Sequence, residues 1–221
     1  MLSRSMAAIA AVALSVCSLS VPALAGDAAP FNAQGAPQVA QARAPLPEAG
    51  TFISNLASDA IAGMADKTMS LEERTARFRK LLTGHFDVPE IAKFVLGRYW
   101  RVATPDERTE YTKLFEDYIV NIYASRFQEY NGEQLKVNSA VKDDDGAFVS
   151  SAITRQAGAP VKVDWKLRSE APSFKIVDVM VEGVSMSVTQ RDDFAAAIQA
   201  HGGKVAGLIE MLKQKVQTAA K

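Results

Sequence analysis

The sequence predicts an α+β fold in which helices precede and follow one antiparallel sheet. Helix-capping patterns and an apolar period of about 3.6 residues extend from Thr51 to Tyr130. A two-residue period replaces them between Leu135 and Val181, and helical patterns return after this region. Because helices and strands occupy separate parts of the chain, we expect helices to cover one face of a four-stranded sheet.

The helical region before the sheet begins at Thr51, and three further helix starts place an N-cap residue three positions before a glutamate. These starts lie at Ser70–Glu73, Asp87–Glu90 and Thr104–Glu107. The last of them has proline at its first helical position and continues without a breaker to Tyr130. Aromatic and aliphatic residues recur along it at helical spacing, so one face of this long helix should lie against an apolar surface.

Four segments are predicted strands, with short polar connections between them: 135–141, 147–155, 161–168 and 174–181. The third alternates most regularly, since charged residues separate Val161, Val163, Trp165 and Leu167. One face of the sheet should therefore be apolar and the other exposed to water. A capping pattern at Thr189–Asp192 opens a further helix, and a Gly-Gly pair separates it from a last helix that ends near residue 218.

The N-terminus has the features of a cleavable secretory signal. Arg4 precedes an apolar run of about 14 residues, which is too short to span a bilayer. An Ala-Leu-Ala sequence ends at Ala25, so we expect cleavage after about this residue and export from the cytoplasm. A retained anchor fits less well because Pro22 interrupts the run, and lipid attachment at Cys17 fits less well because Val16 stands where a small residue is needed.

Residues 26–50 are rich in Ala, Pro, Gln and Gly and are predicted to form a disordered leader, so residues 51–218 would form a single domain. Removal of 25 of the 221 residues leaves 196, enough for one core. The signal has one basic and no acidic residue, so the mature chain would contain 24 Lys and Arg and 25 Asp and Glu. A net charge this close to zero gives no basis for nucleic-acid binding. Cys17 is the only cysteine, so the mature chain would have no disulfide.

Two separated segments carry a resemblance to a known family. Residues 85–101 read HFDVPEIAKFVLGRYWR, and residues 177–194 read VDVMVEGVSMSVTQRDDF. Both resemble signatures of the MlaC family of periplasmic phospholipid-binding proteins, also called the toluene-tolerance family, and the likeness covers about residues 51–215. Gln190 departs from the family pattern, which usually has an aromatic residue just before Arg191.

The resemblance implies a curved sheet wrapped by helices into a cone, like the nuclear transport factor fold, with an apolar cavity between sheet and helices. It also implies a monomeric carrier, without metal or cofactor, that shuttles a phospholipid between donor and acceptor complexes of the inner and outer membranes. A hopanoid-associated branch of the family, HpnM, leaves a hopanoid or another isoprenoid lipid open as the alternative cargo.

Apolar residues of the sheet and helices are therefore candidates for contact with lipid tails, although an ordinary packed core would explain the same residues. The candidates are Val95, Tyr99, Trp100, Phe115, Tyr118, Ile122, Val149, Ile153, Val163, Trp165, Val177, Val179, Val181, Leu208 and Leu212. Three arginines, Arg98, Arg101 and Arg191, could meet a phosphate head group at the mouth, and solvated ion pairs explain them equally well.

An isomerase or dehydratase on the same fold would need a carboxylate or histidine with a perturbed pKa inside the cavity. The two histidines, His85 and His201, lie at predicted helix ends. Asp178, with Tyr118 or Tyr99, is the best remaining acid-base pair, and a buried Asp178 would also need a partner such as an arginine. We therefore expect a binding protein without enzymatic activity.

Overall fold

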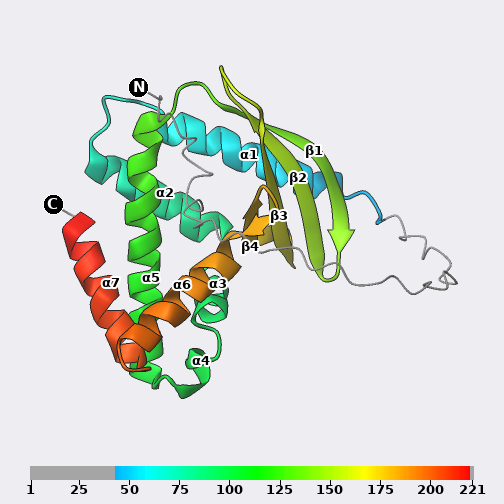
Figure 1. Cartoon of the computed structure of the whole chain (residues 1–221). Coiled ribbons are helices and arrows are strands. Elements are labelled where there is room, and N and C mark those ends of the chain that lie inside the picture. The colour runs from blue at the N-terminus through cyan, green and yellow to red at the C-terminus, as the bar shows by residue number, and fades with distance from the viewer. Residues whose placement is uncertain (1–42, 220–221) are drawn as a thin grey trace, which may run out of the picture.

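The computed structural model of the protein describes residues 43–219, which form a sheet on one side and a group of helices on the other (Figure 1). The predicted signal, and residues 26–42 of the predicted leader, lie outside the described residues. In chain order the elements are α1 (Pro47–Met64), α2 (Leu71–His85), α3 (Val88–Leu96), α4 (Tyr99–Val102), α5 (Pro105–Arg126), the 3₁₀ turn η1 (Phe127–Glu129), β1 (Gln134–Asp143), β2 (Gly146–Thr154), β3 (Val161–Glu170), β4 (Ser173–Val181), β5 (Val184–Ser185), α6 (Met186–Ala200) and α7 (Val205–Ala219).

The three predicted helix caps are present. Ser70 and Thr104 each form a complete capping box, and the Asp87 side chain accepts a hydrogen bond from the Glu90 backbone N–H. These local bonds satisfy backbone donors at the starts of α2, α3 and α5, which is why the sequence alone predicts those starts. Helix α6, in contrast, begins at Met186 instead of Thr189, because the side chain of Ser185 is its N-cap and accepts from the Val188 N–H.

Helix α1 also begins earlier than predicted. Pro47 occupies its first turn, and the residues before it run along the edge of β1. The Leu46 N–H donates to the Ala140 carbonyl at 2.9 Å, and the Lys142 N–H donates to the Ala44 carbonyl at 2.8 Å. Composition assigned all of these residues to the disordered leader. In the structure residues 44–46 pair with a sheet edge far away in sequence, and residues 47–50 form the first turn of α1.

The sheet has five antiparallel strands in the order β1-β2-β3-β4-β5, where the sequence predicted four. The fifth strand has only two residues and follows β4 through a tight turn at Glu182 and Gly183, both with positive φ. A turn of this kind matches the twist of a hairpin, and glycine adopts its second position without strain. The strand is too short to produce a periodic pattern, so the sequence did not reveal it.

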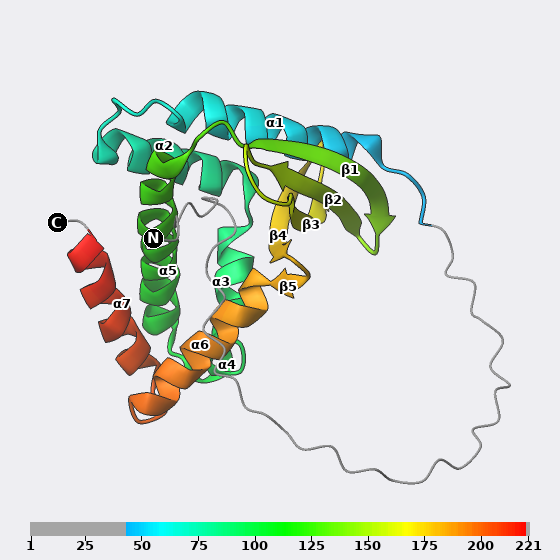
Figure 2. The same ribbon diagram turned by 45° about the horizontal axis from the view of Figure 1, so that its top comes forward.

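Two apolar cores lie on either side of the α2–α3 junction. One fills the space between α1 and the concave face of the sheet, and α1 crosses that face in Figure 2. The other joins α2, α3, α5, α6 and α7. Leu81 and Phe86 pack against both cores. Within residues 43–219, none of the helices is both long and apolar enough to cross a membrane.

Candidate functional site

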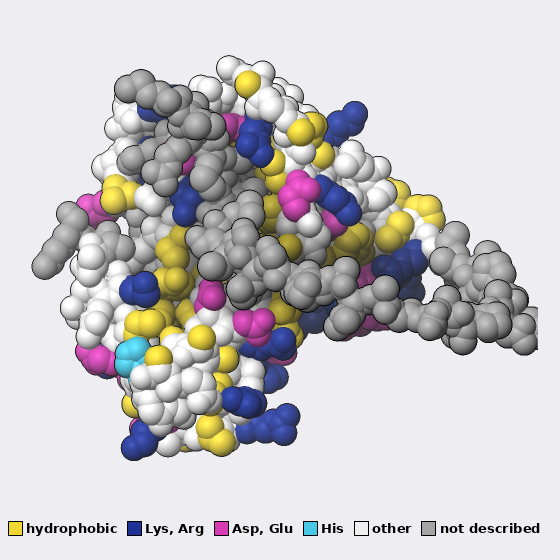
Figure 3. All heavy atoms as spheres, in the orientation of Figure 1, with side chains coloured by type: hydrophobic (Ala, Val, Ile, Leu, Met, Phe, Trp, Pro, Cys, Tyr) yellow, Lys and Arg dark blue, Asp and Glu magenta, His cyan; other side chains and the backbone are white. Residues whose placement is uncertain are grey.

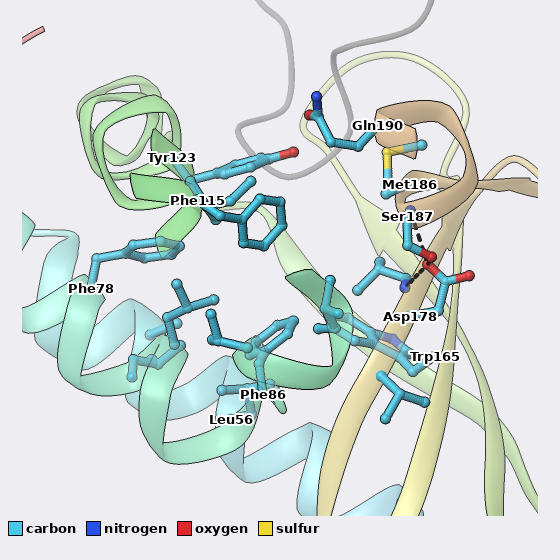
Figure 4. A pocket seen from close by; sticks show the side chains of 18 of the residues that line it. Leu56, Phe78, Phe86, Phe115, Tyr123, Trp165, Asp178, Met186, Ser187 and Gln190 are labelled. Atoms are coloured by element: carbon cyan, nitrogen blue, oxygen red, sulfur yellow. Dashed lines mark hydrogen bonds between the residues drawn. The ribbon is translucent and has the colours of Figure 1, made fainter. Parts of the chain in front are cut away.

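An apolar cavity of about 200 Å³ lies where the two cores meet (Figure 4). Helices α1, α2, α3, α5 and α6 and strands β1, β3 and β4 contribute to its wall. On the face shown in Figure 3, hydrophobic side chains are visible between α5 and the sheet. The lining is formed by Leu56, Ala57, Ala60, Phe78, Leu81, Leu82, Phe86, Val88, Ile91, Val95, Phe115, Ile119, Tyr123, Phe127, Leu135, Trp165, Val177, Asp178, Val179, Met186, Ser187 and Gln190.

The long helix α5 supplies one wall through a regular stripe. Phe115, Ile119, Tyr123 and Phe127 follow one another at four-residue spacing, which places them on one face of the helix and its 3₁₀ extension. Helices α1 and α2 form the opposite wall, where Ala57 and Ala60 are small. Small side chains at these positions leave space that larger ones would fill.

The sheet wall is held by a buried hydrogen-bond chain. The indole N–H of Trp165 donates to the Ser151 hydroxyl at 3.0 Å, and this hydroxyl donates to the Val163 carbonyl at 2.7 Å. Trp165 on β3 is paired with Val179 on β4, and both side chains line the cavity. Ser151 therefore fixes the orientation of the largest side chain in the sheet wall.

A polar cluster lies at one edge of the cavity, where α6 begins beside β4 (Figure 4). The Asp178 carboxylate accepts from the Ser185 hydroxyl at 2.6 Å, from the Ser187 hydroxyl at 2.7 Å and from the backbone N–H groups of Val179 and Ser187. Serine donors, and not an arginine, are therefore the described partners of Asp178. This arrangement ties the first turn of α6 to the sheet, since a carboxylate at a helix N-terminus is favourable.

Two tyrosine hydroxyls and one amide lie near the same end of the cavity. Burial raises the pKa of Tyr123, and the charge of Arg126 opposes this rise. Burial also raises the pKa of Tyr118, Asp193 adds to that rise, and Gln190 opposes it, so the Gln190 amide lies close to the Tyr118 hydroxyl. Among the described residues, no group of three or more potential ligands is arranged to hold a metal ion.

Five of the predicted tail-contact residues line this cavity: Val95, Phe115, Trp165, Val177 and Val179. The others lie elsewhere in the structure. Val149, Ile153, Val163 and Val181 are buried in the core between α1 and the sheet, and Tyr99, Leu208 and Leu212 are buried in the helical core. Trp100 and Tyr118 pack against the helical core, and Ile122 is half-buried on α5 outside the cavity lining.

Neighbouring elements explain why those residues are not at the cavity. Helix α7 packs on α5 on the side away from the sheet, so Leu208 and Leu212 are separated from the cavity by α5 (Figure 1). Val149 and Val163 belong to the buried core that includes Ala49, Ile53 and Leu56 of α1. Sequence reasoning missed the contributions of α1 and α2, although Leu56 and Ala60, like Phe78 and Leu82, have the four-residue spacing of a buried helix face.

The three arginines proposed for the head group do not line the cavity. The Arg98 side chain donates to the Tyr99 hydroxyl at 2.9 Å. The Arg191 guanidinium lies over the ring of Phe94, 4.9 Å from its centroid, where α3 meets α6, and Arg101 is exposed on α4. Cation–π contact with a nearby ring accounts for the position of Arg191.

Comparisons with known proteins agree with this architecture. The chain is 31% identical over 119 residues to toluene tolerance protein ttg2D of Pseudomonas putida, covering 52% of this chain and 55% of that protein. It is 25% identical over 97 residues to the intermembrane phospholipid transport system binding protein MlaC of Haemophilus influenzae, covering 42% and 45%. The matching segments thus span about half the length of these curated relatives.

The fold is shared with a solved structure, the phospholipid-binding protein of Ralstonia solanacearum in complex with a phospholipid. The TM-score is 0.70 at 20% identity, and the match covers 79% of this chain and 99% of that one. This likeness and the arrangement of helices before and after one antiparallel sheet confirm the predicted α+β class. The model of the MlaC protein family matches residues 54–214, which is most of the chain. The chain therefore belongs to the MlaC protein family.

Proposed function

We propose that this protein is a periplasmic lipid carrier that binds the acyl tails of a phospholipid in the cavity between its two cores. It would receive the lipid from one membrane-associated complex and deliver it to another, acting as a monomer between the inner and outer membranes. The apolar cavity carries this proposal. The names of the Haemophilus and Ralstonia proteins and the predicted secretory signal support it.

The energetics of a lipid tail explain why a carrier needs such a cavity. Each CH₂ group that leaves water contributes about 0.8 kcal/mol of favourable transfer free energy. Two tails with about 30 carbons in total are therefore on the order of 25 kcal/mol less stable in water than in an apolar environment. A bilayer offers tails a similar environment, so transfer from membrane to cavity has a small net free energy. Loading and release can therefore both occur.

The cavity volume indicates that loading requires movement. An engineered cavity of about 150 Å³ accepts a molecule the size of benzene, so about 200 Å³ accommodates only a segment of one tail. Two full tails would require the helical core to move away from the sheet core. Leu81 and Phe86, which contact both cores, lie where such a separation would occur.

We also propose that the protein performs no catalysis. Among the described lining residues, Asp178 is the single carboxylate and no histidine is present. Its oxygens already accept hydrogen bonds from two serine hydroxyls and two backbone N–H groups. A general base needs an accessible lone pair directed at its substrate, and this carboxylate is instead committed to the start of α6.

Organic extraction of the protein purified without detergent, followed by mass spectrometry, tests the carrier. We expect phospholipid in the extract, whereas hopanoid would identify the alternative cargo. Two isoleucines on α5 give matched variants, since Ile119 lines the cavity and Ile122 does not. Ile119→Gln should lose the lipid and Ile122→Gln should keep it. An extract of the wild-type protein without lipid, or equal retention by both variants, would contradict the proposal.

A further inference from the structure

One end of the cavity differs from the rest because it presents hydrogen-bond donors. Gln190 on α6 and Tyr123 on α5 lie on facing walls above the apolar interior (Figure 4). An amide supplies two N–H donors and a phenol supplies one O–H. One Gln190 N–H can lie against the Tyr118 hydroxyl while the second remains for a ligand.

Arg126 adds a positive charge to this end. It lies three residues after Tyr123 on α5, which places the two side chains on neighbouring turns of the same side of the helix. Arg126 is half-buried and takes part in none of the ion pairs found within residues 43–219. Its charge acts on the hydroxyl of Tyr123, which is itself a lining residue of the cavity.

The one carboxylate in the lining does not cancel this character. Asp178 lies beside Ser187, and four described donors already occupy its oxygens. Asp193 is exposed and acts on Tyr118, as Gln190 does. Tyr118 precedes Arg126 by eight residues on α5, about 12 Å along the helix, so Gln190 and Asp193 lie at one side of the opening and Arg126 at the other. At the Tyr123 and Arg126 side a ligand therefore meets a phenol donor and one cation, and acceptor atoms suit this side.

We propose that Gln190, Tyr123 and Arg126 form a donor rim that binds the ester and phosphate oxygens of a glycerophospholipid while its tails occupy the cavity. This inference rests on the proposed carrier function and adds the group that selects the lipid class. The amide and phenol suit ester carbonyls, and the guanidinium suits a phosphate, with which it forms two parallel hydrogen bonds. Hydrocarbon lipids that carry neither group would gain nothing from this rim.

Two ligands with identical tails separate the roles of the rim. Phosphatidylglycerol has ester and phosphate oxygens, whereas diacylglycerol has the esters alone, and each can carry one pyrene-labelled tail for a fluorescence titration. Arg126→Gln should weaken binding of phosphatidylglycerol about tenfold and leave diacylglycerol within about twofold. Gln190→Met should weaken binding of both ligands, because both contain the esters. Arg101→Gln, an exposed arginine away from the cavity, is the control and should change neither.

The outcomes distinguish this inference from the carrier proposal. If the wild-type protein binds neither ligand, the carrier proposal itself fails. If it binds both and Arg126→Gln weakens both equally, or changes neither, the donor rim is wrong while the tail cavity stands. Thermal unfolding followed by circular dichroism checks that each variant is folded, and Arg126→Lys should recover part of the binding because it restores the charge without the planar fork.

Discussion

Replacing Ser151 by alanine should destabilise the protein through a single buried side chain, Trp165. Ser151 is 0% exposed, and its hydroxyl accepts from the Trp165 indole at 3.0 Å. Without this hydroxyl the indole N–H is buried without a partner, which costs about 1–3 kcal/mol, and the bond to the Val163 carbonyl adds about 1 kcal/mol. We expect Ser151→Ala to lower the free energy of unfolding by about 2–4 kcal/mol in urea titrations followed by circular dichroism.

A matched control and a double-mutant cycle make this prediction specific. Ser58 is exposed on α1 and donates only to a carbonyl of its own helix, so Ser58→Ala should change stability by less than about 0.5 kcal/mol. In a Trp165→Phe background the indole donor is absent, so Ser151→Ala should cost about 1–3 kcal/mol less than in the wild-type protein. An effect of Ser151→Ala as small as that of the control, or unchanged by Trp165→Phe, would refute the reasoning.

Two further predictions concern the helical core. Arg74 is 0% exposed and donates to the carbonyl of Met64, the last residue of α1, and to the carbonyls of Asp66 and Met69 in the connection to α2. Arg74→Lys should lower the free energy of unfolding in urea by about 2 kcal/mol, because one ammonium cannot reach all three carbonyls. A loss below about 0.5 kcal/mol would contradict this role. Burial raises the pKa of Tyr111, so the stability that its protonated form contributes is complete below about pH 10, the unfolded value, and falls by about 1.4 kcal/mol per pH unit above it. Near neutral pH, Tyr111→Phe should lower the free energy of unfolding by about 1 kcal/mol, because the bond to the Ala92 carbonyl is lost. Between about pH 10 and pH 11, the variant should lose less stability than the wild-type protein in urea titrations. An equal alkaline loss in both proteins would exclude Tyr111 as its source.

Local signals predicted much of the fold. The starts of α2 and α5 depend on side-chain bonds within four residues, and such bonds are written directly in the sequence. The four longer strands were also predicted, most clearly β3, in which apolar and charged residues alternate. The start of α1 was missed because the residues before it are ordered by pairing with β1, which a local pattern does not show. The fifth strand was missed because its two residues, Val184 and Ser185, are too few to form a pattern.

The cavity lining was harder to predict because α5 is apolar on more than one side. It contacts α2, α3 and α7 as well as the cavity, so Tyr118 and Ile122 resemble Ile119 and Tyr123 in the sequence. Which stripe faces the cavity depends on where the neighbouring helices pack, and a periodic pattern contains no such information. The arginines of the two family segments were expected to meet the head group, whereas no sequence pattern pointed to Arg126, three residues after the cavity-lining Tyr123.

The two tryptophans allow the most direct test of the central proposal, that lipid tails occupy this cavity. Trp165 lines the cavity, whereas Trp100 lies on α4 beside Arg108 and outside the lining. A phospholipid with brominated acyl chains quenches indole fluorescence only on close contact. In Trp100→Phe, where Trp165 is the single reporter, we predict strong saturable quenching, and in Trp165→Phe, where Trp100 remains, little quenching. Equal quenching of the two variants, or none in Trp100→Phe despite bound lipid, would contradict the account.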